Sequence, residues 1–183
     1  PNAVGGGLWY EPFVMMDKPR YGPYVYREKD QIHFTWDLNT PAYDYHNQGW
    51  YRLAIPKQWD RSQKRPRRIY WTDPYLDEAA TEALMITVDA LMTNPEEGVI
   101  GMATVDLSLE DLQTMVARMT VTANSRPFAV DTSSGLLIAY PADPDRLLHR
   151  VSDLDWGTAL EALNVQPDKV SLHSIQIEGA DFS

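Results

Sequence analysis

The 183-residue sequence contains no cysteine, no long hydrophobic run and few positive charges. Without cysteine, the chain can form neither disulfides nor thiolate sites for zinc binding or catalysis. Its apolar stretches are shorter than the roughly 18 residues that a membrane-spanning helix needs, so we expect no span within these residues. Lys and Arg number 16 against 26 Asp and Glu, which gives a net charge of −10. So acidic a chain is not expected to bind nucleic acid or anionic lipid.

The signatures of common catalytic and cofactor sites are also missing. The sequence has no G-x-S-x-G nucleophile elbow and no P-loop, and its four histidines follow no metal-binding spacing. We therefore expect no catalytic residue, no metal and no cofactor. The triple glycine at residues 5–7 precedes an expected strand rather than a helix. It therefore predicts a close turn and not a phosphate-binding loop.

The residues that are present predict a folded chain with an uneven distribution of aromatic side chains. Apolar residues make up 44% of the sequence, which argues against general disorder. Of the 20 aromatic residues, 16 lie between Trp9 and Tyr75. The length allows one medium domain or two small ones. Because the chain begins at Pro1 without a recognisable signal peptide, we expect a fragment whose targeting or transmembrane segment lies outside it.

Hydrophobic periodicity predicts an α+β fold in two units, residues 1–124 and 125–183. Strands are expected at residues 8–16, 24–27, 31–37, 81–92, 98–107, 127–131, 136–140 and 169–177. Helices are expected at residues 47–54, 109–119 and 155–163. Ser108 fits the N-cap of the second helix, with Asp111 three residues later. The segment 38–74 is irregular and aromatic, and such long loops inside compact domains are typical of functional sites.

Aromatic residues and carboxylates alternate in and just after this segment. The aromatic members are Tyr43, Trp50, Tyr51, Tyr70, Trp71 and Tyr75, and the acidic ones are Asp44, Asp73 and Asp77. Ring faces attract ammonium groups and carboxylates pair with them, so the pattern suits a small cationic or amphipathic ligand. A large core with Asp at turns would give a similar pattern.

A second interpretation is a secreted carbohydrate-active protein. Aromatic side chains stack on sugars, and paired carboxylates hydrolyse glycosides when they are held at the right separation. The candidate carboxylates are Asp37, Asp44, Asp73, Asp77 and Asp106. Their separation in space decides this hypothesis, and the sequence does not give it.

Four segments resemble the double Cache family, the extracytoplasmic sensor domains of bacterial chemoreceptors, sensor histidine kinases and related signalling proteins. They are YDYHNQGWYRLA at 43–54, WTDPYLDEAATEALMITV at 71–88, GVIGMATVDLSLEDL at 98–112 and RPFAVDTSSGLLIAYP at 126–141. The resemblance implies two PAS-like modules with antiparallel sheets. The larger, membrane-distal module (residues 1–124) would bind the ligand, and residues 125–183 would begin the membrane-proximal module.

The resemblance also implies a set of ligand-binding residues. Amino-acid-binding members share Y-x-x-x-x-R-x-W-Y, then Y-x-D, then a late Asp. The matching residues here are Tyr43, Gln48, Trp50, Tyr51, Tyr75, Asp77 and Asp106. Gln48 stands where the family has the Arg that holds the ligand carboxylate. An amine, a methylated ammonium compound or another amino-acid-like solute is therefore expected in place of an ordinary α-amino acid.

The resemblance further implies a membrane-anchored receptor whose sensor part lies outside the cytoplasm and is not itself an enzyme. Family members have a long N-terminal helix that packs along both modules and often forms a homodimer. No such helix is expected within this sequence. An output domain such as a kinase or cyclase would lie elsewhere in the full-length protein.

Overall fold

The computed structural model describes residues 3–29, 31–61, 63–95, 98–119, 122, 125–154 and 156–157. The chain forms two compact units, Pro1–Asp111 and Leu112–Ser183. The division falls within a helix, about a dozen residues before the predicted boundary at 124. In the part of the chain that the structure describes, no helix is both long and apolar enough to cross a membrane.

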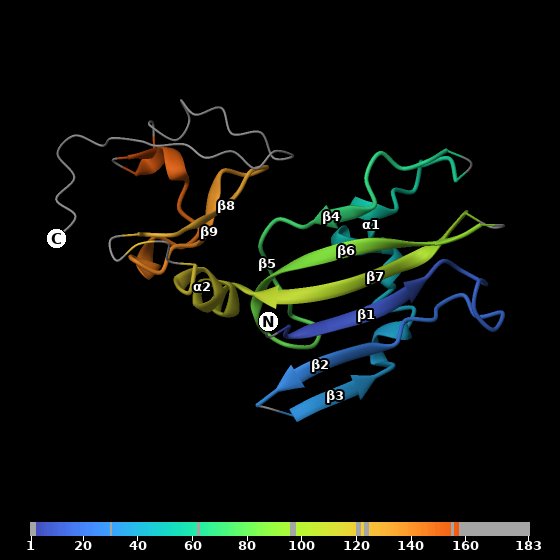
Figure 1. Cartoon of the computed structure of the whole chain (residues 1–183). Coiled ribbons are helices and arrows are strands. Elements are labelled where there is room, and N and C mark those ends of the chain that lie inside the picture. Colours follow the sequence, from blue (N-terminus) through green and yellow to red (C-terminus); the bar gives the residue numbers. More distant parts are fainter. Residues whose placement is uncertain are drawn as a thin grey trace. The chain divides into compact units, whose positions relative to one another are not determined.

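The first unit is built on an antiparallel sheet of seven strands (Figure 1). The strands are β1 (Gly5–Tyr10), β2 (Tyr24–Glu28), β3 (Gln31–Thr35), β4 (Ile69–Trp71), β5 (Tyr75–Leu76), β6 (Leu84–Asn94) and β7 (Gly98–Ser108). They lie in the order β3-β2-β1-β7-β6-β4, and β5 also pairs with β6. The predicted strands at 24–27, 31–37, 81–92 and 98–107 are confirmed with small shifts of their ends.

The two long central strands place alternate side chains on opposite faces of the sheet. Along β6, the side chains of Met85, Thr87, Asp89 and Leu91 share one buried face. The β7 residues that pair with Thr87 and Asp89 are Asp106 and Thr104, and both are also buried. One face of the sheet therefore carries two threonines and two aspartates, which is unusual for a buried surface.

Short helical segments cover this face. They are η1 (Asp37–Asn39), η2 (Tyr45–Asn47) and α1 (Gly49–Ala54), and α1 lies behind the sheet in the view of Figure 1. The core between them and the strands includes Trp9, Tyr24, Tyr45, Tyr51 and Met102. Many of the aromatic residues in the first 75 positions thus fill the layer between the sheet and its covering loops. The predicted helix at 47–54 is confirmed as α1.

The other face of the sheet exposes apolar side chains in a row that crosses six strands. The strand register aligns Phe34, Val25, Gly6, Val105, Val88 and Trp71 in that order. Phe34, Val25, Val105 and Trp71 are all exposed. An apolar surface of this extent is typical of a face that packs against another protein element.

The second unit contains most of α2 (Leu109–Ala117), a hairpin of β8 (Ala129–Asp131) and β9 (Leu136–Ala139), η3 (Pro144–Arg146) and η4 (Val151–Asp153). Its core is formed by Leu137, Tyr140, Val151 and Leu154. The predicted N-cap of α2 is confirmed, because Oγ of Ser108 accepts a hydrogen bond from the Asp111 amide at 3.0 Å. The predicted helix at 155–163 lies almost wholly outside the described residues, and the predicted strand at 169–177 lies entirely outside them.

The prediction for the first strand was wrong at both ends. The three glycines at 5–7 are part of β1 and not a turn before it. β1 then ends at Tyr10, whereas residue 16 was expected. Phe13, Met16 and Asp17 have φ values of 66°, 55° and 51°, and this left-handed region interrupts an extended strand. The short strands β4 and β5 were not predicted.

Candidate ligand-binding site

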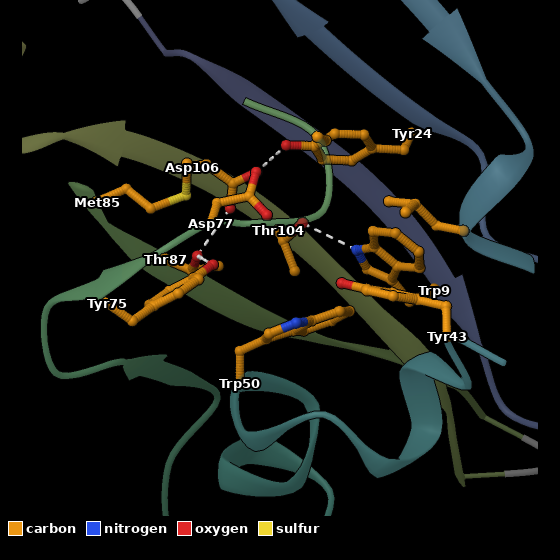
Figure 2. A pocket seen from close by; sticks show the side chains of 12 residues that line it. Trp9, Tyr24, Tyr43, Trp50, Tyr75, Asp77, Met85, Thr87, Thr104 and Asp106 are labelled. Carbon is orange, nitrogen blue, oxygen red and sulfur yellow. Dashed lines mark hydrogen bonds between the residues drawn. The ribbon is translucent and has the colours of Figure 1, made fainter. Parts of the chain in front are cut away.

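A pocket of about 300 Å³, including space open to solvent, lies on the covered face of the sheet in the first unit (Figure 2). Residues from β1, β2, β5, β6, β7 and the covering segments contribute to it. The lining residues are Trp9, Tyr24, Leu38, Tyr43, Trp50, Tyr75, Asp77, Ala80, Met85, Thr87, Thr104 and Asp106. The enclosed free space is close to that of one water molecule, so the side chains around it must move apart to admit a ligand of several heavy atoms.

Aromatic rings form most of the pocket wall. Trp9 is fully buried, and its ring centroid lies 4.9 Å from that of Trp50 at an interplanar angle of 55°. Tyr24 lies 5.7 Å from Trp9 on the other side. Tyr43 and Tyr75 complete the ring set. Rings held against one another in this way are rigid walls, and their faces carry partial negative charge.

Asp106 lies at the polar end of the pocket and is only 5% exposed. Its Oδ2 accepts a hydrogen bond from the Tyr24 hydroxyl at 2.9 Å, and its Oδ1 accepts one from the Thr87 hydroxyl at 2.8 Å. Both bonds are drawn in Figure 2. Burial raises the pKa of Asp106, and these two hydrogen bonds oppose the rise because they stabilise the ionised carboxylate. The site thus holds a carboxylate that gains from a cation placed beside it.

Tyr75 extends this network by one step. Its hydroxyl lies 2.7 Å from Oγ1 of Thr87. Because the single hydroxyl proton of Thr87 is donated to Asp106, Tyr75 is the donor in this contact. The hydrogen bonds therefore run from Tyr75 to Thr87 and from Thr87 to Asp106. Both hydroxyls stabilise negative charge on the Asp106 carboxylate.

The second carboxylate, Asp77, is held by the turn that follows β5. Its Oδ2 accepts hydrogen bonds from the amide and the hydroxyl of Thr81, at 2.9 and 2.8 Å. Its Oδ1 accepts a longer bond from the Ala79 amide, at 3.2 Å. These bonds fix the carboxylate where it faces Asp106 in Figure 2. The predicted turn role and the predicted pocket role of Asp77 are compatible.

Two glycines of β1 leave space for pocket residues. Gly5 leaves space for Tyr24 and Asp106 at the polar end of the pocket, and Gly7 leaves space for the Trp9 indole. A methyl group added at Gly5 would lie 2.2 Å from the Tyr24 hydroxyl and 2.9 Å from Oδ2 of Asp106. One added at Gly7 would lie 2.7 Å from the Trp9 indole. The glycine run therefore provides space on the strand between β2 and β7, so that Tyr24 reaches Asp106 across it.

Five of the seven residues expected to bind ligand lie together in this pocket. They are Tyr43, Trp50, Tyr75, Asp77 and Asp106. Gln48 and Tyr51 do not line it. Nε2 of Gln48 donates to the Tyr43 carbonyl at 2.7 Å, where Gln48 is the N-cap residue of α1. Gln48 thus holds the loop that carries Tyr43.

Tyr51 has a structural position on the far side of α1. It is fully buried, and its hydroxyl donates to Oε1 of Glu11 at 2.5 Å. Nη2 of Arg61 donates to the other oxygen of the same carboxylate at 2.8 Å. Burial raises the pKa of Tyr51, so its hydroxyl stays protonated as a donor. Tyr51 therefore ties α1 to the segment after β1 and does not line the pocket.

Sequence reasoning missed the pocket residues that come from the strands. Trp9, Tyr24, Thr87 and Thr104 all line the pocket, and Trp9 donates from Nε1 to Oγ1 of Thr104 at 2.9 Å. The signal that could have found the threonines is the polar residue at every second position of two otherwise apolar strands. Trp9 and Tyr24 gave no such signal, because an aromatic residue in a strand is ordinarily a core residue.

The charged residues that line the pocket are both acidic. Among the residues that the structure describes, those lining it include two carboxylates, five aromatic rings and no Lys, Arg or His. Burial raises the pKa of Tyr43 to about 12 and also raises those of Tyr24 and Tyr75. The tyrosines are therefore neutral at ordinary pH and act as hydrogen-bonding groups. No group of three or more His, Cys, Asp or Glu that could hold a metal occurs in the described part of the chain.

The fold has counterparts in known proteins. The family model for the methyl-accepting chemotaxis protein-like, first PDC sensor domain matches residues 1–114. The chain belongs to this family. The matched PDC sensor domain contains the whole of the seven-stranded sheet and every residue that lines the pocket.

A curated relative is the methyl-accepting chemotaxis protein McpC of Bacillus subtilis, which is 31% identical over 101 residues. That match covers 55% of this chain and 14% of McpC. The present PDC sensor domain therefore corresponds to a small part of a much longer receptor.

Solved structures share the fold. The extracellular domain of soHK1S-Z6, described as a histidine kinase, is 25% identical with a TM-score of 0.58, over 90% of this chain and 57% of that one. A structure titled Methyl-accepting Chemotaxis protein X is 21% identical with a TM-score of 0.60, over 88% and 59% of the two chains. The sheet-dominated, antiparallel, PAS-like fold is thus that of the extracellular sensor domains of chemoreceptors and histidine kinases. The relatives are sensor domains, which are not enzymes.

Proposed function

We propose that the first unit binds a small organic cation, an amine or a methylated ammonium compound, and is the ligand-binding module of a transmembrane receptor. One observation carries this proposal. The pocket lining combines Asp77 and Asp106 with five aromatic rings and, among the described residues, no positively charged side chain. A cation gains from the carboxylates and from the ring faces together, and desolvation strengthens both effects.

The same lining disfavours a zwitterionic ligand. An α-amino acid needs a cationic group for its carboxylate, and family members supply an Arg for this purpose. The corresponding residue here is Gln48, whose amide is engaged by the Tyr43 carbonyl. The chemoreceptor CtaA of Pseudomonas fluorescens has been solved with L-serine, but at 15% identity it shares only the fold. A ligand carboxylate in the present pocket would approach Asp77 or Asp106 without a compensating charge.

A carbohydrate-binding role is supported less well. Asp77 is engaged by Thr81 and Ala79, and Asp106 by Tyr24 and Thr87. Two carboxylates whose ionised forms accept hydrogen bonds from the protein are poorly placed to donate a proton to a glycosidic oxygen. Sugars nevertheless belong in the binding test below as a separate class.

In this proposal, the full-length protein is a double Cache receptor. The second unit would be the membrane-proximal module, and binding would be relayed through it to a membrane helix. A long helix from outside residues 1–183 would pack on the outer sheet face, and would form a homodimer with its copy. The row of exposed apolar side chains that includes Phe34, Val105 and Trp71 supports such a partner for this face.

A calorimetric binding screen tests the proposed ligand class. The panel holds primary amines, methylated ammonium compounds, neutral amino acids and monosaccharides. We expect binding only among the cations, and at least about a 30-fold loss of affinity in Asp106→Asn, because one partner of a buried charged pair is removed. Asp145→Asn makes the same charge change at an exposed position in the second unit and is the control. Binding of amino acids or sugars with no binding of cations would refute the proposal.

A further inference from the structure

A third carboxylate lies beside the pocket and has no partner. Asp89 of β6 is 0% exposed, and neither of its carboxyl oxygens has a hydrogen-bond partner among the described residues. Buried carboxylates in folded proteins are nearly always paired or hydrogen-bonded, because an isolated one loses its hydration without compensation. A buried Asp89 carboxyl without a hydrogen-bond partner therefore requires a physical explanation.

The strand register places Asp89 on the pocket face of the sheet. It is two residues after Thr87 on β6, and it pairs directly with Thr104 on β7. Both threonines line the pocket, so the Asp89 side chain lies one step beyond the pocket wall, on the same face. Asp106 pairs with Thr87, which makes Asp89 and Asp106 diagonal neighbours, with Cα atoms about 7–8 Å apart.

Among the residues that the structure describes, no positively charged side chain forms an ion pair with Asp89. Burial raises its pKa to about 8, and the charge of Asp106 adds to the rise. The residue that pairs with it on β4 is Tyr70, whose ring centroid lies 5.0 Å from the Arg65 guanidinium, and the acidic groups of the pocket are Asp106 and Asp77. Without a cation beside it, Asp89 is therefore protonated near neutral pH. A cation that reached it would take the place of the proton.

We infer that Asp89 is an inner cation subsite of this pocket, and that the ligand is a short aliphatic diamine with one ammonium at Asp106 and the other at Asp89. This inference rests on the proposed function and narrows its ligand class. A chain of about four or five carbons spans roughly 6–7.5 Å between ammonium groups, close to the Cα separation of diagonal neighbours on paired strands. On this face the register places Thr87 and Thr104 beside the two aspartates, and the Trp9 indole, which donates to Oγ1 of Thr104, offers apolar surface to the methylene chain.

Calorimetry with two matched ligands tests the inference. Putrescine carries two ammonium groups on four carbons, and n-butylamine is the same chain with one of them. We expect the intact chain to bind putrescine about 10- to 100-fold more tightly, because the second ammonium gains a charged hydrogen bond in a dry site. Asp89→Asn should remove that preference and leave n-butylamine affinity within about twofold. Asp145→Asn should leave both affinities unchanged.

A second measurement needs no variant and covers the case in which Asp89→Asn does not fold. Titrations in two buffers of different ionisation enthalpy give the number of protons released on binding. Putrescine should release close to one more proton than n-butylamine at neutral pH, because its second ammonium displaces the proton of Asp89. Equal proton release, or a putrescine preference that survives in a folded Asp89→Asn, would overturn the inference.

The outcomes also separate this inference from the proposed function. If n-butylamine binds in an Asp106-dependent manner and putrescine binds no better, then the cation pocket stands and the inner subsite is refuted. If neither amine binds, both are refuted.

Discussion

The hydroxyl of Tyr24 donates to Oδ2 of Asp106 at 2.9 Å, although the two residues are 82 positions apart in the sequence. They lie on β2 and β7, with β1 between them. The bond is possible because Gly5 of β1 has no side chain at the crossing point. Three neighbouring strands of the sheet are thus arranged so that Asp106 accepts a hydrogen bond from Tyr24, which lies two strands away.

Gly5→Ala should disrupt this arrangement. The new methyl group would lie 2.2 Å from the Tyr24 hydroxyl, so either the tyrosine or the strand must move. We expect a loss of about 1–3 kcal/mol in the free energy of unfolding, since a buried hydrogen bond is broken and its acceptor is a charged group. Urea denaturation followed by tryptophan fluorescence measures the loss.

Gly49→Ala is the matched control for that substitution. A methyl group at Gly49, the first residue of α1, meets nothing within 4 Å. Alanine is also the better helix former, so stability should be unchanged or slightly higher. Equal denaturation midpoints for the two variants would show that the space at Gly5 has no structural role.

Tyr24→Phe should change the pH dependence of amine binding. The hydroxyl lowers the pKa of Asp106 by stabilising its carboxylate. Without it the pKa rises further, and the carboxylate that the cation needs forms only at higher pH. The acid limb of the affinity profile should therefore move to higher pH, as measured by calorimetry across a pH series. Tyr26→Phe, on the same strand and outside the pocket lining, should leave the profile in place.

Asp89 should make the chain less stable as the pH rises. Its folded pKa of about 8 lies above the ordinary value of 3.8, so between these values the folded state holds a proton that the unfolded state has released. The free energy of unfolding therefore falls by up to about 1.4 kcal/mol per pH unit in that window. It levels off above about pH 8.

Asp89→Asn removes this contribution. We expect the variant to gain stability over the unaltered chain at about pH 8 and to gain much less at about pH 5. Thermal denaturation at both pH values measures the difference, with Asp145→Asn as the reference for an exposed charge. A gain that is the same at the two pH values would show that Asp89 is ionised in the folded state.

Ser108→Ala tests the start of α2. The Ser108 hydroxyl accepts the Asp111 amide bond at 3.0 Å and donates to the Asp111 carboxylate at 2.8 Å. Loss of an N-cap costs about 0.5–2 kcal/mol, which a shift in the urea midpoint would report. Thr114→Ala, at an exposed position within the same helix, should change stability little. A Ser108→Ala midpoint equal to that of Thr114→Ala would argue against the cap.

Periodicity alone was enough to predict the central hairpin, because β6 and β7 are long, rich in β-branched residues and separated by a clear turn. The cap of α2 was predictable for the same reason, since its signal is local. The end of β1 was not, because three residues in left-handed conformations interrupt a segment whose composition still favours a strand. The short strands β4 and β5 depend on pairing with β6, and a two- or three-residue strand has no periodicity of its own.

The site was predictable to the extent that its residues follow one another in the chain. Tyr43, Trp50, Tyr75, Asp77 and Asp106 came from motif spacing, and the structure brings these five together. Gln48 and Tyr51 share the same motif but take structural positions, because the first turn of α1 points successive side chains in different directions. The contribution of Trp9 and Tyr24 depends on strand order, and the unpartnered state of Asp89 depends on every neighbour around it. Neither follows from a one-dimensional pattern.

In the proposed function, the pocket selects an organic cation and rejects the same molecule when it carries a carboxylate. Calorimetry with n-butylamine and L-norvaline tests it most directly, because norvaline is n-butylamine with a carboxylate on the carbon that bears the amine. We expect n-butylamine to bind and norvaline to bind at least about 30-fold more weakly, since its carboxylate meets Asp77 and Asp106 without a cationic partner. Norvaline binding as tightly as n-butylamine, or more tightly, would contradict it.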